Sequence, residues 1–168
     1  RIPLLETPAW PFDGINEMGL VVGMAAVPSA GDMPIDPEKE TSYSLPMIRE
    51  MLDHAANVEQ AVALMGSYNI IFGGPPLHYL LADSSGRSAL VEFYQGEMVV
   101  TYNDQPWQMA TNFLCAENGE CTEGRCRRYD AISERLAETQ GRLAMEEAMD
   151  LLAEVSQEST QWSILYDL

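Results

Sequence analysis

The clearest candidate for chemistry in this sequence is an asparagine at the end of the segment MATN, residues 109–112, after which the chain turns apolar again. Asparagine forms strands poorly and prefers turns and caps, where its side chain bonds nearby backbone groups. Taken alone, Asn112 therefore indicates a capped turn. The other residues of the chain must decide whether it has a chemical role.

A second candidate lies in the stretch EGRCRRYD, residues 123–130, where three arginines crowd the start of a predicted helix. Cations are favoured at the opposite end of a helix, because the N-terminus carries partial positive charge. Arg127 and Arg128 are best explained as surface charges offset by the many carboxylates. Arg125, a dozen residues after Asn112, could face the same site as the asparagine.

The other reactive residue types give weaker signals. His54 and His78 have no metal-ligand partner at useful spacing, and we expect neither a metal ion nor a cofactor. Cys115, Cys121 and Cys126 match no common zinc spacing, and their number is odd. Free or partly buried thiols are the favoured interpretation, and one disulfide with a thiol left over is the alternative. The sequence contains no phosphate-binding glycine loop and no nucleophile elbow.

The composition limits the classes of partner. The chain has 168 residues, of which 46% are hydrophobic, so residues 1–168 are expected to form a single globular domain. Its 26 acidic and 9 basic residues give a net charge of -17, which repels nucleic acid and anionic lipid. No apolar run approaches the roughly 20 residues that cross a bilayer. We expect no nucleic-acid or membrane partner, favour the cytoplasm, and leave assembly into a homo-oligomer open.

The elements that must position these residues follow from periodicity and turn chemistry. Residues 15–27 form a nearly unbroken apolar run that predicts a strand buried on both faces, and residues 29–44 predict a long loop. Two helices follow, one starting near Ser44 and one capped by Asn57 and ending at Gly66. The remaining predictions are three antiparallel strands over 77–103, helices over 125–138 and 143–157, and a last strand over 161–167. This order predicts the α+β class.

Four segments in this order resemble the linear amide C–N hydrolase family. They are DGINEMGLVVG at 13–23, LHYLLADSSGRSALVEF at 77–93, MATN at 109–112 and TQWSILYDL at 160–168. The family contains penicillin V acylase, choloylglycine (bile salt) hydrolase and the acyl-coenzyme A:6-aminopenicillanic acid acyltransferase group. The resemblance implies the N-terminal-nucleophile hydrolase fold, a four-layer αββα sandwich of two antiparallel sheets between helical layers.

The resemblance also implies a mechanism. The family's nucleophile is a cysteine freed at the mature N-terminus, whose own α-amino group takes the thiol proton. In the family, the asparagine of the TN strand end donates a hydrogen bond in the active site. An arginine further along the chain fixes the nucleophile and its surroundings. These roles fall on Asn112 and Arg125. We therefore expect both to be catalytic, with Asn112 at a strand end facing a cleft and with Arg125 withdrawn from solvent and directed toward it.

The sequence also departs from the family pattern. Residue 1 is Arg1, so we expect a fragment that lacks the N-terminal strands and the cysteine, and that is inactive alone. Residues 25–27 are Ala-Ala-Val where the bile salt branch has an asparagine, which favours the acyltransferase-like branch. Cys115 is no substitute nucleophile, because it has no free amine. The expected function is amidohydrolase or acyltransferase action on a small-molecule, non-peptide linear amide. The alternative is a non-catalytic relative that serves as a binding or assembly module.

Overall fold

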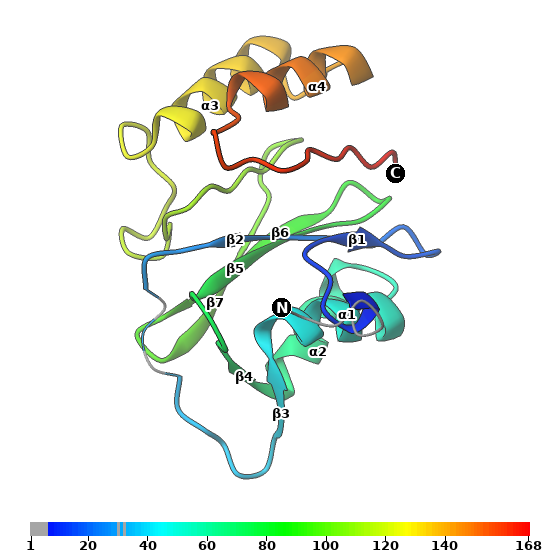
Figure 1. The fold of residues 1–168 in the computed structure, drawn as a ribbon, viewed down its shortest axis with the longest axis vertical. Helices are drawn as coiled ribbons and strands as arrows, with labels where there is room; N and C mark the ends of the chain where they lie inside the picture. Colours follow the sequence, from blue (N-terminus) through cyan, green and yellow to red (C-terminus); the bar gives the residue numbers. More distant parts are fainter. Residues whose placement is uncertain (1–6, 30, 32) are drawn as a thin grey trace.

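The computed structural model describes residues 7–29, 31 and 33–168. Figure 1 shows them as helical layers on the two sides of one antiparallel sheet. Its five strands lie in the order β1-β2-β5-β6-β7, with every neighbouring pair antiparallel. The strands are β1 Gly14–Ile15, β2 Val21–Ala26, β5 Leu77–Ala82, β6 Ser88–Tyr94 and β7 Glu97–Tyr102. The three-stranded meander predicted over residues 77–103 is confirmed.

The apolar run at 15–27 forms a hairpin of β1 and β2 instead of one continuous strand. Asn16 makes the turn, because its Oδ1 accepts the backbone N–H of Leu20 at 3.0 Å. The Nδ2 of the same side chain donates to the Ala55 carbonyl at 2.7 Å and so ties the hairpin to the end of a helix. Within β2 only Val22 is fully buried, so the expected burial of this strand on both faces is wrong.

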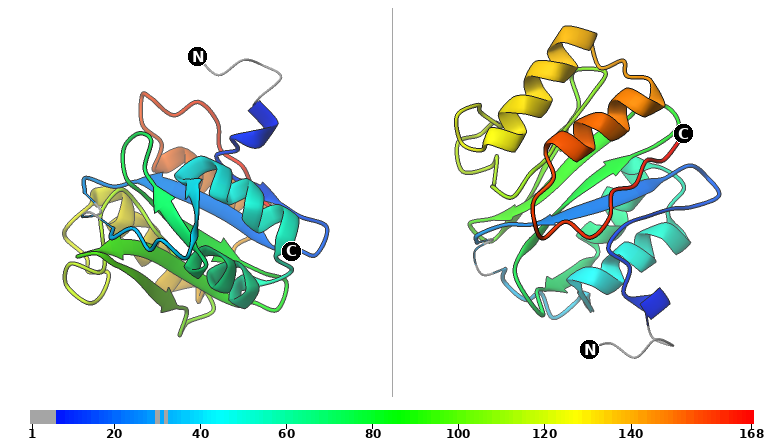
Figure 2. Two further views of the ribbon diagram at one scale, coloured as in Figure 1. Left: turned by 90° about the horizontal axis from the view of Figure 1, so that it is seen from below. Right: turned by 45° about the horizontal axis from the view of Figure 1, so that its top comes forward.

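Helices α1, Ser44–His54, and α2, Val58–Gly66, cover one face of the sheet, as the left view of Figure 2 shows. A short 3-10 helix, η1, spans Thr7–Ala9. Asn57 caps α2 as predicted, accepting the backbone N–H of Gln60 at 3.0 Å. The main core lies between these helices and the sheet, and its largest fully buried side chains include Leu20, Met47, Ile48, Met51, Met65, Tyr79, Leu81 and Phe93.

A second, two-stranded sheet lies where the sequence predicted a loop. β3, Glu40–Tyr43, pairs in parallel with β4, Tyr68–Ile71. Neither strand was predicted, because β3 follows a stretch rich in Pro, Asp and Glu and both strands are only four residues long. The buried Asn69 fixes the preceding loop, since its Oδ1 accepts the N–H of Asp36 at 2.9 Å and its Nδ2 donates to the Asp36 carbonyl at 2.8 Å.

The opposite side of the large sheet carries helices α3, Arg127–Thr139, and α4, Met145–Glu154. Figure 1 shows the C-terminal segment running between these helices and the sheet. Residues 155–168 form no strand, so the strand predicted over 161–167 is wrong. A strand requires a hydrogen-bonded neighbour, and this segment has none among the described residues. The described residues therefore form one of the two large sheets expected for a four-layer sandwich.

No helix among the described residues is both long and apolar enough to span a membrane. Within the same ranges, no group of three or more His, Cys, Asp or Glu side chains is placed to hold a metal ion.

Candidate active site

Asn112 lies on the irregular segment that follows β7, and it contacts the end of β2. Its Nδ2 donates to the carbonyl oxygen of Ala26, the last residue of β2, at 2.7 Å. The side chain is otherwise exposed. The asparagine thus sits beside a strand end, as expected, although its own segment is not a strand. This contact joins the MATN segment to the end of β2, the strand that continues the segment 13–23.

Arg128, in the first turn of α3, holds the other end of the same amide. Its Nη2 donates to Asn112 Oδ1 at 2.7 Å. The two contacts fix the orientation of the amide group. The Ala26 carbonyl can only accept a hydrogen bond, from the amide nitrogen, and the Arg128 guanidinium can only donate one, to the amide oxygen. An asparagine NH₂ group has two N–H donors, and Ala26 uses one of them. The arrangement therefore holds Asn112 in one orientation, and its second N–H has no hydrogen-bond partner among the described residues.

Arg125 approaches the site from a different direction. Its Nη1 donates to the Leu114 carbonyl at 3.1 Å, and its Nη2 pairs with Glu117 Oε2 at 2.6 Å. A backbone carbonyl and a carboxylate therefore hold this guanidinium. Its side chain is 31% exposed, and its contacts are to the loop two residues beyond Asn112. The expectation that Arg125 points at Asn112 while Arg128 points elsewhere is wrong.

The helix geometry explains which arginine reaches the asparagine. Successive residues of an α-helix are rotated by about 100°, so Arg127 and Arg128 point in clearly different directions. Arg125 precedes Cys126, the N-cap residue of α3, and lies outside the helix. The prediction treated Arg125 as the start of the helix, whereas the helix begins two residues later.

An open cavity of about 390 Å³ lies next to this site. It is formed by the start of α3 and the end of α4, with Arg127 and Arg128 on one side and residues 154–157 on the other. Arg128 thus connects Asn112 to the cavity, although Asn112 is not among the residues that line it. The expectation that Asn112 itself faces a cleft is not met in the described residues.

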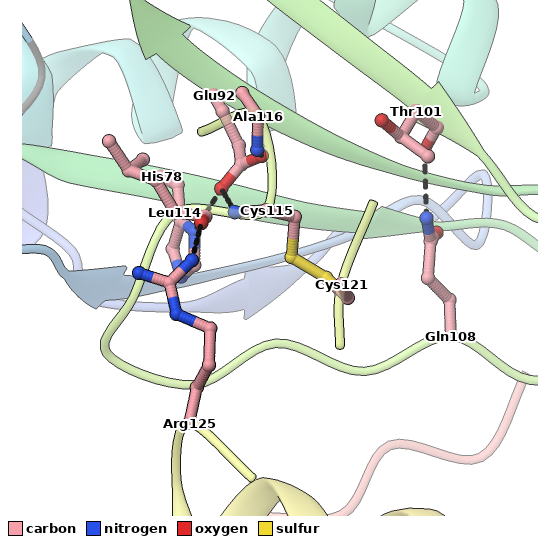
Figure 3. The surroundings of a disulfide bond; sticks show 9 residues. All are labelled: His78, Glu92, Thr101, Gln108, Leu114, Cys115, Ala116, Cys121 and Arg125. Carbon is pink, nitrogen blue, oxygen red and sulfur yellow. Dashed lines mark hydrogen bonds and ion pairs between the residues drawn. A yellow bond between two sulfur atoms is a disulfide. The ribbon is translucent and has the colours of Figure 1, made fainter. Parts of the chain in front are cut away.

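The cysteines follow the alternative interpretation. Cys115 and Cys121 form a disulfide, and Cys126 is a free thiol, as Figure 3 shows for the bonded pair. The favoured expectation of free thiols is therefore wrong for two of the three. Burial raises the pKa of the Cys126 thiol, but hydrogen bonding to the Tyr129 amide and the charge of Arg128 outweigh this, so its pKa is lowered overall.

A match to a family model shows which family the chain belongs to. The model of the linear amide C–N hydrolases, choloylglycine hydrolase family, matches residues 4–113. This span includes Asn112 and more than half of the chain. The chain belongs to the choloylglycine hydrolase family. The resemblance inferred from the four sequence segments is thereby confirmed.

Two solved structures show the same fold. The chain is similar to penicillin V acylase from Agrobacterium tumefaciens, with 22% identity, a TM-score of 0.67, and coverage of 88% of this chain and 51% of the other. A variant of conjugated bile acid hydrolase from Clostridium perfringens gives 14% identity, a TM-score of 0.68, and coverage of 90% and 61%. The predicted α+β class and N-terminal-nucleophile hydrolase fold are confirmed.

A curated relative extends the comparison. The uncharacterized protein A284L of Paramecium bursaria Chlorella virus 1 is 28% identical over 140 residues, covering 77% of this chain and 50% of that protein. The chain therefore spans about half the length of this relative and of the penicillin V acylase.

Two buried polar residues of the large sheet have no predicted role. His78 in β5 and Glu92 in β6 are each 1% exposed, and their side chains contact each other at 3.3 Å. The sequence predicts for His78 only that it has no metal-ligand partner, and it predicts nothing for Glu92. The available signal was a polar residue inside each of the apolar runs LHYLL and LVEFY. A buried glutamate is rare without a partner, so this pattern indicates a specific contact.

Proposed function

We propose that the protein cleaves the C–N bond of a small, non-peptide linear amide, by hydrolysis or by transfer of the acyl group to an acceptor. Membership of the choloylglycine hydrolase family supports the reaction class. The proposed nucleophile is the N-terminal cysteine that the family resemblance implies, because a disulfide occupies Cys115 and Cys121 and neither they nor Cys126 has a free α-amine. The free α-amine of such a cysteine would serve as its base, since an α-amine titrates near pH 8.

The observation that carries this proposal is the fixed amide of Asn112. Ala26 and Arg128 hold its two ends, and one N–H stays available in an exposed position. Attack on an amide carbonyl places negative charge on the carbonyl oxygen, and a pre-oriented N–H donor stabilises that charge without reorganisation. Removing one such donor costs on the order of 3 kcal/mol in the transition state.

The two arginines take different roles in this proposal. Arg128 orients Asn112 directly, because its guanidinium binds the amide oxygen. Arg125, the arginine that the family resemblance indicated, fixes the Leu114 carbonyl and so shapes the backbone just after Asn112. We propose that both belong to the active site. The residues Ala25 and Ala26 favour the acyltransferase-like branch over bile salt specificity.

The test uses the natural full-length protein. It is assayed with penicillin V, with a glycine-conjugated bile salt, and with an acyl-coenzyme A plus a primary amine. Turnover of at least one amide substrate is expected, with loss after iodoacetamide treatment. A Cys126→Ser variant serves as the control, since its activity and its sensitivity to alkylation should match the parent.

The Asn112→Ala variant then tests the role of the asparagine. It should lower kcat by about 10²–10³-fold. Asn118→Ala, an exposed asparagine on the same loop, should leave kcat unchanged. Absence of turnover on every substrate would contradict the enzymatic proposal and support a binding module. Equal losses in the two variants would remove Asn112 from the chemistry.

A further inference from the structure

A glutamate lies in the interior of the large sheet, on the face directed away from α1 and α2. Its neighbours in β6, Val91 and Phe93, belong to the core under those helices, and side chains alternate along a strand. Glu92 therefore points to the opposite side, which also carries Leu90 and Phe113. Its side chain is only 1% exposed.

Two backbone N–H donors and one imidazole nitrogen converge on this carboxylate, as Figure 3 shows. Oε1 accepts the backbone N–H of Cys115 at 2.8 Å, and Oε2 accepts the backbone N–H of Ala116 at 2.8 Å. The Nδ1 of His78 lies 3.3 Å from Oε1. The two backbone groups can only donate, so the glutamate acts as a clamp on two successive peptide groups.

The clamped peptides belong to the segment that carries Asn112. Residues 111–116 form no helix or strand, so no ladder of backbone hydrogen bonds holds them. Cys115 comes three residues after Asn112, and Phe113 packs against Tyr129 with ring centres 5.2 Å apart. The backbone N–H groups of Cys115 and Ala116 both donate to Glu92. Cys115 is buried and Ala116 is partly buried, so water has limited access to these groups.

We propose that Glu92, with His78 as its third partner, is a positioning residue that sets the place of the Asn112 side chain. The inference rests on the proposed function of Asn112. It assigns to β6 a role in the site although the hydrogen bonds of the Asn112 side chain within the described residues go to Ala26 and Arg128. The His78 Nε2 is buried and has no hydrogen-bond partner among the described residues, so the imidazole is held by its Nδ1 contact alone.

Stability alone does not account for a carboxylate at this place. Burying an ionisable group is costly, and a well-packed apolar side chain commonly stabilises a core more than a buried charged network does. The carboxylate instead supplies two acceptors at one point, which no apolar residue can do. A glutamate at this position therefore fixes the geometry of the loop and, through it, the position of Asn112.

The test is Glu92→Gln in the full-length protein, with Val91→Ala as the matched control. Glutamine has nearly the same shape but one acceptor oxygen, so one of the two amides loses its partner. We expect hydrogen exchange to accelerate at least about tenfold at whichever of the Cys115 and Ala116 amides loses its acceptor. Val91→Ala removes a fully buried side chain of the same strand on the opposite face, so it should destabilise the protein without this local effect.

Two further readouts separate positioning from simple destabilisation. In protein labelled with ¹⁵N-asparagine, the side-chain resonances of Asn112 should shift in Glu92→Gln and stay in place in Val91→Ala. With a substrate that the assay described above shows to be turned over, Glu92→Gln should lower kcat by about tenfold and change KM by less than about twofold. Val91→Ala should leave both constants unchanged at a temperature where the protein is folded.

The outcomes distinguish this inference from the proposed function. Unchanged exchange at Cys115 and Ala116, or unchanged Asn112 resonances, in Glu92→Gln overturns the positioning role. Identical changes in Val91→Ala also overturn it, because they would follow from lost stability. If the parent protein turns over no amide, the proposed function fails, and the exchange and resonance measurements still decide whether Glu92 holds Asn112.

Discussion

The two faces of the large sheet are built in different ways. Under α1 and α2, four residues of α1 alone are buried, and apolar side chains from both helices and four strands form one continuous core. On the other face, α3 buries only Tyr129 and α4 only Leu151. Single polar contacts, such as Asn112 to Ala26 and Glu92 to Cys115, fix this side.

This difference separates apolar packing from directed polar contacts on the two faces of one sheet. Apolar burial is non-directional and supplies most of the folding free energy, whereas a hydrogen bond fixes direction and contributes little net stability. A catalytic donor needs fixed direction. The proposed site around Asn112 lies on the face where the backbone is irregular and polar contacts determine its path.

The largest expected effect tests the apolar face. Leu81→Ala removes a fully buried side chain of β5 in the main core, and it should lower the free energy of unfolding by about 2–5 kcal/mol. Leu165→Ala, in the C-terminal segment and 41% exposed, should change it by less than about 0.5 kcal/mol. Urea denaturation of both variants measures the two values. Similar losses would show that the two faces do not differ as described.

The second prediction concerns the polar face and uses activity. Arg128→Lys should lower kcat by about 10–100-fold, because a lysine does not reproduce the planar guanidinium that binds Asn112 Oδ1. Arg125→Lys should have a smaller effect, since Arg125 contacts the Leu114 carbonyl instead of Asn112. Arg127→Lys is the control and should leave kcat unchanged. A larger loss for Arg125→Lys than for Arg128→Lys would restore Arg125 to the principal role.

The third prediction tests a junction between the helices and the sheet. Asp83 is buried at the end of β5, and its Oδ2 accepts the first backbone N–H of α2, that of Val58, at 2.9 Å. Burial raises the pKa of Asp83, but hydrogen bonds from Ser85 and Val58 outweigh it, so its pKa lies below the ordinary value of 3.8. Asp83→Asn should cost about 1–3 kcal/mol at pH 7, because one donor loses its acceptor.

The pH dependence of the same variant gives a sharper result. A carboxylate whose pKa is lowered by folding adds stability that is present above about pH 4 and is lost as the pH falls below this value. The difference in unfolding free energy between the parent and Asp83→Asn should therefore shrink between pH 4 and lower values. A difference that stays constant over this range would contradict the assigned role of the charge.

The elements of the fold that could be predicted from the sequence are those that depend on local patterns. The meander and the Asn57 cap are local patterns, in which turn residues and apolar periodicity lie next to each other in the chain, and both were predicted. The parallel pair β3–β4 was missed, since its register joins Glu40 to Tyr68 across two helices and depends on tertiary packing. Residues 161–167 have the pattern of a strand, but a strand is defined by its partner, which no local pattern supplies.

The predictability of the site was similarly limited. Asn112 was found through the family resemblance, and its contact with Ala26 spans 86 positions that no local rule connects. The choice between Arg125 and Arg128 depended on where α3 begins, and helix boundaries are uncertain by one or two residues. Glu92 carried a visible signal as a charged residue inside an apolar strand. The identity of its partners, two backbone amides of a distant loop, required the structure.

The smallest expected effect concerns the C-terminal segment. Tyr166 donates its hydroxyl hydrogen to Asp13 Oδ1, which connects the end of the chain to the residue before β1. Burial, then the hydrogen bond and charge of Asp13, raise the pKa of Tyr166 to about 12. Tyr166→Phe should lower the free energy of unfolding by about 0.5–1.5 kcal/mol at pH 7, with Tyr94→Phe as the control.

The alkaline pH dependence of this variant follows from the sign of the shift. A group whose pKa is raised by folding adds stability that is complete below the unfolded value of 10.0 and is lost as the pH rises toward about 12. The difference between the parent and Tyr166→Phe should therefore be constant from pH 7 to 9 and should decrease above pH 10, because an ionised phenol cannot donate to a carboxylate. Urea denaturation at these pH values measures it. A difference that grows above pH 10 would show that the Asp13 contact does not hold the C-terminal segment.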